Sequence, residues 1–399
     1  MKRFLSLLPV LLIALTGCGA KTVASSPDVS PAAAEASLTP VPVTAVDLSW
    51  PFWEAYKKRF VSDDGRVIDV TFGGHSTSEG QSYGMFFSLV ANDRETFDRM
   101  LNWTVNNLAA GDLSANLPAW KWGEKEPGQW GVIDQNAASD ADLWISYVLL
   151  EAGRLWEEPK YTELGHGLLA LIVEKEIADL PGLGPMLLPA PEGFQVSSNV
   201  WRLNPSYLPI PVLQGLRTHN APGPWQKVID STVQMIRQTT PQGFIADWVA
   251  YRGNKGFAPD PVKGTVGSHD AIRCYLWAGM INDDSPEKGP VASQLTGMLS
   301  YWRKFGRLPE KINAWRNIPL DTTSPVGFLA VILPELQSAG STDELNTLLT
   351  QIGMFANGNL YGKNPAYYDQ NLLLFGKGFI EYRFRFGPDG LLKLKWKES

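Results

Sequence analysis

The feature that most constrains the fold is a succession of helical segments, about a dozen in all, that begins near Trp50 and continues almost to the C-terminus. Residues such as Gly111, Pro159 and Pro241 separate the segments, because glycine and proline interrupt helices. The predicted helices cover residues 51–61, 80–92, 94–109, 139–156, 160–176, 205–218, 223–239, 268–280, 288–305, 325–337, 341–354 and 365–379. Strands do not alternate with these helices, which argues against a fold built on a parallel sheet. The pairing of helices into hairpins suggests a closed double ring, and spacing by itself predicts a large all-α domain.

Three longer segments between the helices, residues 111–138, 181–204 and 241–267, are predicted loops. At the C-terminus, residues 382–386 and 392–396 alternate apolar and basic side chains around a Gly-Pro-Asp-Gly turn, which predicts a β-hairpin. Loops held by a rigid scaffold often carry ligand contacts. The tryptophans in the three predicted loops are Trp120, Trp122, Trp130, Trp201 and Trp248.

The N-terminus has the organisation of a targeting signal. Basic residues precede an apolar run over residues 4–15, which is too short to span a membrane. The run ends in Leu-Thr-Gly-Cys, which resembles the bacterial lipobox, so residues 1–18 are a predicted lipoprotein signal peptide with Cys18 as the lipidated residue. Gly19 favours sorting to the outer membrane, which places the protein in the periplasm. The alternative is an ordinary signal peptide cleaved near Ala20.

Residues 19–47 are rich in Ala, Pro, Ser, Thr and Val and cannot bury a core, so they are a predicted flexible tether. Residues 48–399 then form one folded domain, which would contact a membrane only through the lipid anchor. Cys274 is the only cysteine besides Cys18, so no intramolecular disulfide is expected.

The composition excludes several classes of function. A net charge of −6 argues against a phosphate-backbone ligand, so no nucleic-acid partner is expected. None of the four histidines forms a pair with metal-ligand spacing, and no phosphate-binding loop occurs, so neither a metal nor another cofactor is expected. The 15 tryptophans fit two interpretations, because their broad faces can stack on sugar rings or fill a core.

Three of the predicted helices begin with a carboxylate behind small residues: Glu79 in the segment 77–84, Asp140 in 138–142 and Asp270 in 267–273. Helix starts that face one another would gather these acids in one cleft. Paired carboxylates across a sugar linkage are the requirement of glycoside hydrolysis.

The surroundings of Asp270 suit a general base. Arg273 lies three residues further on the predicted helix, on the same face, and would keep the Asp270 carboxylate ionised. Glu79 has the opposite requirement as a general acid, since it must carry a proton, and burial with nearby carboxylates would have to outweigh the helix dipole. The alternative for both residues is a plain helix-capping role, which is the commoner meaning of such patterns.

Residues 80–84 also fit the G-x-S-x-G pattern of an esterase, with Ser82 as the nucleophile. That motif needs a strand before it and a parallel-sheet fold. The polar, glycine-containing stretch 73–77 precedes it here, so the esterase interpretation is disfavoured.

Six sequence blocks, taken together and in order, resemble glycoside hydrolase family 8, and within it the periplasmic endoglucanases encoded with bacterial cellulose synthases. The resemblance extends from about Trp50 to the C-terminal hairpin. The blocks are residues 66–69, 77–84, 117–123, 138–142, 201–207 and 270–273.

This resemblance implies an (α/α)6 barrel of six helical hairpins and an inverting mechanism. Glu79 matches the family's proton donor and Asp270 its general base. Asp140 matches a third acid that binds the −1 sugar and favours its distorted ring.

The resemblance also implies substrate contacts. Tyr207 matches a tyrosine that helps to hold the catalytic water, and Trp120 and Trp122 match a sugar-binding block. Arg273 is predicted as a further substrate-binding residue. One departure is His269, which stands where close relatives carry Tyr, beside the expected base.

The expected function is therefore an endo-β-1,4-glucanase associated with cellulose biosynthesis. Its partners would be cellulose chains and the cellulose synthase complex, and we expect a monomer. Two alternatives remain open: a non-catalytic glucan-binding lipoprotein, and a chitosanase or xylanase on the same scaffold.

Overall fold

The computed structural model describes residues 47–71 and 73–398. The predicted signal peptide, Cys18 and the tether up to residue 46 lie outside the described residues, so they stay predictions. Among the residues that are described, no helix combines the length and apolarity needed to cross a membrane.

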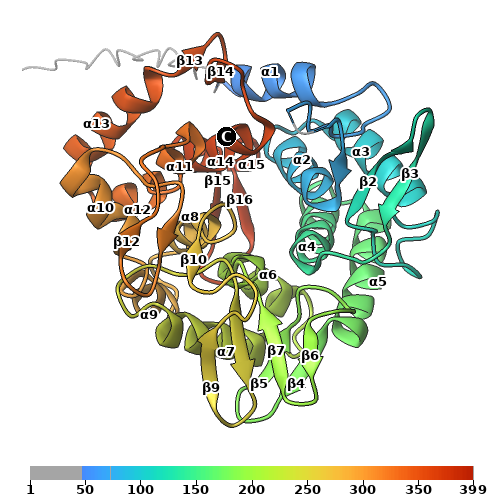
Figure 1. Cartoon of the computed structure of the whole chain (residues 1–399). Coiled ribbons are helices and arrows are strands. Elements are labelled where there is room, and N and C mark those ends of the chain that lie inside the picture. Colours follow the sequence, from blue (N-terminus) through green and yellow to red (C-terminus); the bar gives the residue numbers. More distant parts are fainter. Residues whose placement is uncertain (1–46, 72, 399) are drawn as a thin grey trace, which may run out of the picture. The chain divides into compact units, whose positions relative to one another are not determined.

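The helices follow one another around a ring, as the progression of colours in Figure 1 shows, and this is the predicted (α/α)6 barrel. Six pairs combine a helix that is buried almost all round with a more exposed one. The pairs are α2 (Ser78–Val90) with α3 (Arg94–Asn107), α4 (Ser139–Leu155) with α5 (Pro159–Lys175), α6 (Ile210–His219) with α7 (Trp225–Thr239), α8 (Ile272–Met280) with α9 (Lys288–Ala292) and α10 (Gly297–Phe305), α11 (Val326–Ala330) and α12 (Leu333–Ser338) with α13 (Thr342–Gly353), and α14 (Tyr367–Ile380) with α1 (Pro51–Phe60). A short α15 (Lys395–Glu398) ends the described chain.

The inner helices meet on a cluster of aromatic rings. Phe375 of α14 lies 5.1 Å from the Tyr83 ring, 5.4 Å from Trp144 and 5.3 Å from Trp277, measured between centroids. Burial of such rings supplies much of the apolar stabilisation of a core. The core interpretation of the tryptophans is therefore right for Trp144 and Trp277. The same cluster contacts the polar residues described below, since Arg273 donates to the Tyr83 hydroxyl and Trp277 Nε1 donates to Ser206 O.

Four predicted helices differ from the structure, because each was predicted as one continuous helix that is in fact shorter or interrupted. The prediction over 205–218 is a 3-10 turn, Pro205–Tyr207, followed by α6, because Pro209 disfavours helical geometry in the residue before it. The prediction over 288–305 divides into α9 and α10, where Gly297 N donates to Gly243 O at 2.8 Å instead of continuing a helix. The prediction over 325–337 likewise divides into α11 and α12.

The fourth correction affects the site. Helix α8 begins at Ile272, and Asp270 lies in the turn before it rather than in its first helical turn. The expected i, i+3 neighbours are nevertheless close, since Arg273 N donates to Asp270 O at 3.1 Å.

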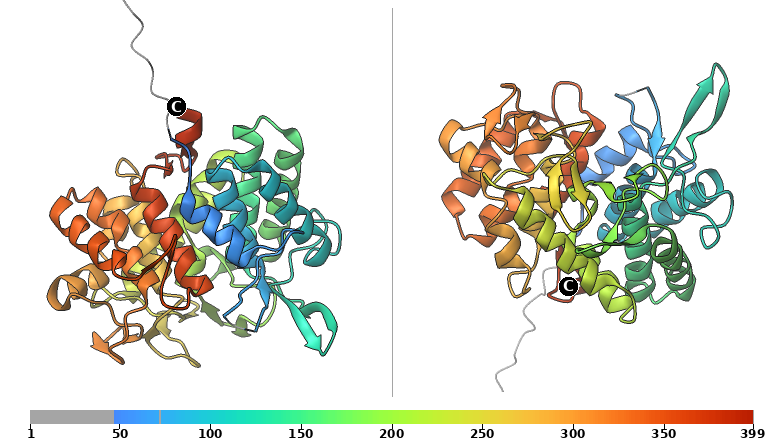
Figure 2. Two further views of the ribbon diagram at one scale, coloured as in Figure 1. Left: turned by 90° about the horizontal axis from the view of Figure 1, so that it is seen from above. Right: turned by 60° about the horizontal axis from the view of Figure 1, so that its bottom comes forward.

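The three predicted loops contain antiparallel strands. The first holds β2 (Lys121–Glu126) and β3 (Gln129–Asp134), a hairpin that projects from the ring of helices in both views of Figure 2. The short β1 (Ser76–Thr77) pairs with β2, and β4 (Ile177–Leu180) pairs with β5 (Gly184–Leu187). The other two loops join in one sheet in the order β6 (Gln195–Ser197), β7 (Val200–Leu203), β8 (Val249–Arg252), β9 (Gly256–Pro259).

Smaller sheets complete the fold. Strand β10 (Val266–Gly267), which directly precedes the turn that carries Asp270, forms a sheet with β11 (Ile312–Asn313) and β12 (Ile318–Pro319). Strand β13 (Ala356–Asn357) pairs with β14 (Leu360–Tyr361). The predicted C-terminal hairpin is present as β15 (Phe384–Phe386) and β16 (Leu392–Leu394).

Candidate active site

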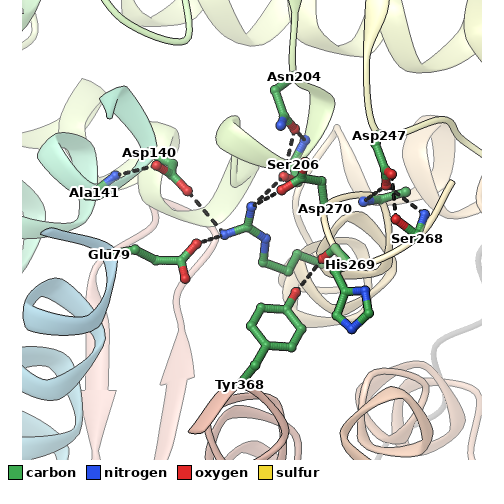
Figure 3. A network of polar contacts seen from close by, with 12 residues as sticks. Glu79, Asp140, Ala141, Asn204, Ser206, Asp247, Ser268, His269, Asp270 and Tyr368 are labelled. Carbon is green, nitrogen blue, oxygen red and sulfur yellow. Dashed lines mark hydrogen bonds and ion pairs between the residues drawn. The ribbon is translucent and has the colours of Figure 1, made fainter. Parts of the chain in front are cut away.

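The starts of three inner helices bring the three predicted acids together around Arg273. Glu79 is the second residue of α2, Asp140 is the second residue of α4, and Asp270 precedes α8 by two positions. Arg273 Nη1 donates to Glu79 Oε2 and, at 3.1 Å, to Asp140 Oδ2, while its Nη2 donates to Asp270 Oδ1 at 3.0 Å. Figure 3 draws these contacts as dashed lines. One guanidinium thus contacts carboxylates from three separate elements.

The Arg273 side chain, which is only 2% exposed, is held from both sides. Its Nη1 donates to the Tyr83 hydroxyl at 3.1 Å, and its Nη2 donates to Ser206 Oγ at 3.0 Å. Ser206 in turn donates to Asn204 Oδ1 at 2.8 Å, and the Tyr207 ring lies 5.7 Å from the guanidinium carbon. The turn Pro205–Tyr207 therefore holds the Arg273 side chain in place, and Arg273 in turn orients the three carboxylates that it contacts.

Burial raises the pKa of the Asp140 carboxyl to about 7; the positive charge of Arg273 opposes the rise, and the negative charge of Glu79 adds to it. The Asp140 carboxylate also accepts a hydrogen bond from Ala141 N at 2.8 Å. Since three carboxyl groups share one guanidinium, the cluster favours the retention of a proton near neutral pH.

The raised pKa of Asp140 predicts a pH dependence of stability. Between its ordinary pKa of 3.8 and about 7 the folded protein binds more protons here than the unfolded chain, so this contribution to stability is lost as pH rises through the window. Asp140→Asn, which has no proton to lose, should therefore gain stability relative to wild type from about pH 5 to about pH 8. Urea unfolding across this range measures the difference.

The same comparison isolates Asp140 from its neighbours. Burial also raises the pKa of Asp142 and of Glu176, but both carboxyls are present in wild type and variant alike. Asp63→Asn, at an exposed position, serves as the control and should follow the wild-type curve. A constant difference between Asp140→Asn and wild type at every pH would contradict the prediction.

A local strand pairing fixes the helix start that carries Glu79. Thr77 pairs with Lys121 across β1 and β2, Ser78 N donates to Trp120 O at 3.1 Å, and Gly80 N donates to Thr77 Oγ1 at 3.1 Å. A cavity of about 250 Å³ opens beside Glu79. The other residues that line it are Val67, Asp69, His75, Thr77, Trp120, Lys121, Tyr367 and Tyr368. Trp120, which the family resemblance assigns to a sugar-binding block, thus lines the same cavity as Glu79.

Trp122 lies on the projecting hairpin. Its ring stacks on Trp130 with centroids 5.4 Å apart, and the Arg66 guanidinium lies over both rings, at 4.4 Å from Trp122 and 4.9 Å from Trp130. Trp122 does not line the cavity beside Glu79, and its ring also meets Trp103 of α3 edge to face, with centroids 5.3 Å apart.

An aromatic pair that sequence reasoning missed, Trp248 and Phe194, lies next to Tyr207. Trp248 stacks on Phe194 with centroids 5.5 Å apart and an interplanar angle of 5°, and it lies 6.2 Å from Tyr207. The Arg202 guanidinium lies 5.0 Å from the Trp248 ring. The only sequence signal was the presence of Trp248 in a predicted loop, because the sheet that joins β7 to β8 was not predicted.

The geometry decides the esterase idea and shows the surroundings of His269. Ser82 is fully buried inside α2 and donates to Glu79 O at 2.7 Å, so it cannot act as an exposed esterase nucleophile. The His269 ring packs against Phe328 and Tyr368, with centroids 5.2 Å and 5.4 Å away, and its carbonyl accepts a hydrogen bond from the Tyr368 hydroxyl. His269 thus contacts Tyr368 through both its ring and its backbone.

Comparisons with known proteins give a consistent family. The family model for "Glycosyl hydrolases family 8" matches residues 38–381. An endoglucanase of Salmonella typhi is 43% identical over 352 residues, which cover 88% of this chain and 92% of that protein. Among solved structures, the endo-1,4-D-glucanase of Vibrio fischeri ES114 is similar with a TM-score of 0.78 at 38% identity, covering 87% of this chain and 99% of that one. Endoglucanase Cel10 of Klebsiella pneumoniae has a TM-score of 0.67 at 26% identity, covering 83% and 98%.

Proposed function

The chain belongs to glycosyl hydrolase family 8 and is a glycoside hydrolase, and from this premise we propose that it is an endo-β-1,4-glucanase that cleaves cellulose-type glucan with inversion. The observation that carries the proposal is the convergence of Glu79, Asp140 and Asp270 on the single guanidinium of Arg273. Helix-capping roles alone give no reason for three helix starts to meet at one buried arginine.

Exposure of the three side chains supports a division of roles. Asp270 is 34% exposed and Glu79 is 22% exposed, whereas Asp140 is 4% exposed. A general base must reach a water molecule and a general acid must reach the substrate, so we assign the base to Asp270 and the acid to Glu79. The buried Asp140 then binds the −1 sugar and favours its distorted ring.

The reaction is a single displacement. Glu79 donates its proton to the glycosidic oxygen as the bond from that oxygen to the anomeric carbon breaks. Asp270 accepts a proton from the water that attacks the same carbon from the opposite face, so a β-linked substrate gives an α-configured product. The guanidinium of Arg273 contacts both carboxylates, and an inverting mechanism requires the two carboxyl groups to stand about 6.5–9.5 Å apart.

Aromatic residues supply the sugar platforms in this proposal. Trp120 lines the cavity beside Glu79, where one sugar next to the cleaved bond would bind. The Tyr207 phenol is neutral near neutral pH, since its ordinary pKa is 10.0 and burial raises the pKa further, so it can donate a hydrogen bond to the catalytic water. Trp248 with Phe194 offers a further face beyond Tyr207, and we place Trp122 at the edge of the substrate path rather than at its centre.

We propose that the protein acts in the periplasm on cellulose chains, as a monomer attached to the outer membrane through Cys18, and that it works alongside a bacterial cellulose synthase complex. The lipobox pattern at the end of the apolar run supports the anchor. Labelling of growing cells with radioactive palmitate tests it, and label retained by Cys18→Ser would contradict it.

The activity itself is tested with the purified protein on carboxymethyl-cellulose, xylan and chitosan in parallel. New reducing ends from carboxymethyl-cellulose are expected, with far fewer from the other two glycans. Preferred cleavage of xylan or chitosan would reassign the substrate on the same site. Binding to carboxymethyl-cellulose without cleavage of any glycan would instead support the non-catalytic alternative.

A further inference from the structure

A fourth carboxylate, Asp247, lies behind the turn that carries Asp270 and has no role in the mechanism above. It precedes β8 and is 8% exposed. Its Oδ1 accepts hydrogen bonds from Ser268 N at 2.6 Å and Ala271 N at 2.8 Å, and its Oδ2 accepts one from Ser268 Oγ at 2.6 Å. Figure 3 shows these bonds beside the network around Arg273. Asp247 N also donates to Val266 O at 2.8 Å, so backbone and side chain together hold the segment 266–271.

These bonds determine where the Asp270 carboxylate can lie. The N–H groups at the start of a helix have no partner within the helix, and Asp247 satisfies two of them just before α8. Ile272 N donates to Ser268 O at 3.0 Å, so the turn that Asp247 holds continues directly into the helix that carries Arg273. The turn therefore has one anchored geometry, with Asp270 between the two residues whose N–H groups Asp247 binds.

Charge gives Asp247 a second effect on Asp270. The titratable groups that face Asp247 are Asp270, Cys274, Tyr275 and Tyr368. Burial raises the pKa of the Cys274 thiol and of both phenols, so these three groups are neutral near neutral pH. The Arg273 guanidinium contacts Asp270 whether or not position 247 is charged, so a change at Asp247 tests the effect of that one negative charge on Asp270. A nearby negative charge strengthens a carboxylate as a base.

We propose that Asp247 is a positioning residue for the general base: it fixes the turn that aims Asp270 at the catalytic water, and its charge strengthens Asp270 as a proton acceptor. This inference rests on the proposed role of Asp270. It differs from a purely structural cap in predicting effects on kcat and on the pH profile.

Two variants separate position from charge. Asp247→Ala removes all three hydrogen bonds and should lower kcat on carboxymethyl-cellulose by about 100-fold, because a small misplacement of a catalytic group is enough for such a loss. KM should change little, since no substrate contact is lost. Asp247→Asn keeps an acceptor for the two backbone N–H groups but removes the charge, so the acidic limb of its kcat profile should move to lower pH.

Asp93→Ala is the matched control. Asp93 caps α3 by accepting a hydrogen bond from Thr96 N at 3.1 Å, but that helix carries none of the proposed catalytic residues. It should lose stability in urea unfolding and keep the wild-type kcat and pH profile. If Asp247→Ala does not fold, the pH profile of Asp247→Asn decides the matter.

The outcomes distinguish this inference from the function on which it rests. If wild type cleaves glucan and Asp247→Asn keeps the wild-type kcat and pH profile, the positioning role is wrong and the glucanase proposal stands. If wild type cleaves no glycan at all, both proposals are overturned. A large loss of kcat in Asp247→Ala with a shifted acidic limb in Asp247→Asn supports both.

Discussion

Glu79→Gln is expected to lower kcat on cello-oligosaccharides by about 10³-fold, because an amide cannot give a proton to the leaving oxygen. The substitution is close to isosteric, and the helix start does not depend on the carboxylate, since Gly80 N is capped by Thr77 Oγ1 at 3.1 Å. Folding and KM should therefore change little. Release of reducing ends from a cello-oligosaccharide series, measured at saturating substrate, gives the value of kcat.

A substrate that needs no protonation distinguishes a missing acid from general damage to the site. With 2,4-dinitrophenolate as the leaving group the loss for Glu79→Gln should shrink to less than about tenfold, because that anion departs without a proton. Glu163→Gln, at an exposed position of the outer helix α5, is the matched control and should keep the wild-type kcat on both substrates. Equal losses on the two substrates would show that Glu79 is not the general acid.

The all-α character of the domain could be predicted from helical periodicity, whereas the (α/α)6 barrel was implied by the resemblance to glycoside hydrolase family 8. Helices α2 and α4 are buried on almost every side, whereas α13 buries only Leu348 and Ile352. The sequence reflects this difference, because apolar residues recur on one face only in α13 and are more evenly spread in α2 and α4. The breaks were harder to predict. The gap between α9 and α10 depends on the contact of Gly297 with Gly243, which a local pattern does not report.

In the site too, contacts between residues far apart in the sequence could not be predicted. Three carboxylates at helix starts were a local signal and led to the expectation of one cleft. The contact of Arg273 with Glu79 joins residues 194 positions apart, so the sequence pattern predicted only its Asp270 contact. Asp247 was missed as well, because it lies in the segment 241–267 that was assigned as loop and its partners Ser268 and Ala271 are 21 and 24 positions further along the chain.

The surroundings of Trp122 were also beyond the sequence pattern. The family resemblance assigns this residue to a sugar-binding block, and that role stays a prediction. Arg66 lies over both Trp122 and Trp130, and neither contact could be derived from the spacing of the tryptophans alone.

Asp270→Asn is expected to lower kcat by about 10³-fold as well, but on both kinds of substrate, because water must be activated whatever the leaving group. This dependence on the leaving group separates the base from the acid. The Arg273 Nη2 contact can persist in the variant through the amide oxygen, so its unfolding midpoint should stay near that of wild type. Rates on a cello-oligosaccharide and on its 2,4-dinitrophenyl counterpart measure the two losses.

The configuration of the first product provides the independent check on Asp270. Wild type should release the α-anomer before mutarotation, as seen in proton NMR spectra recorded during the first minutes of cleavage. A β-configured first product would require a covalent intermediate on an enzyme carboxylate, and Asp270 would then be assigned incorrectly. Restored activity of Asp270→Asn on the dinitrophenyl substrate would contradict the base role in a different way, because it would mean that only leaving-group departure had been impaired.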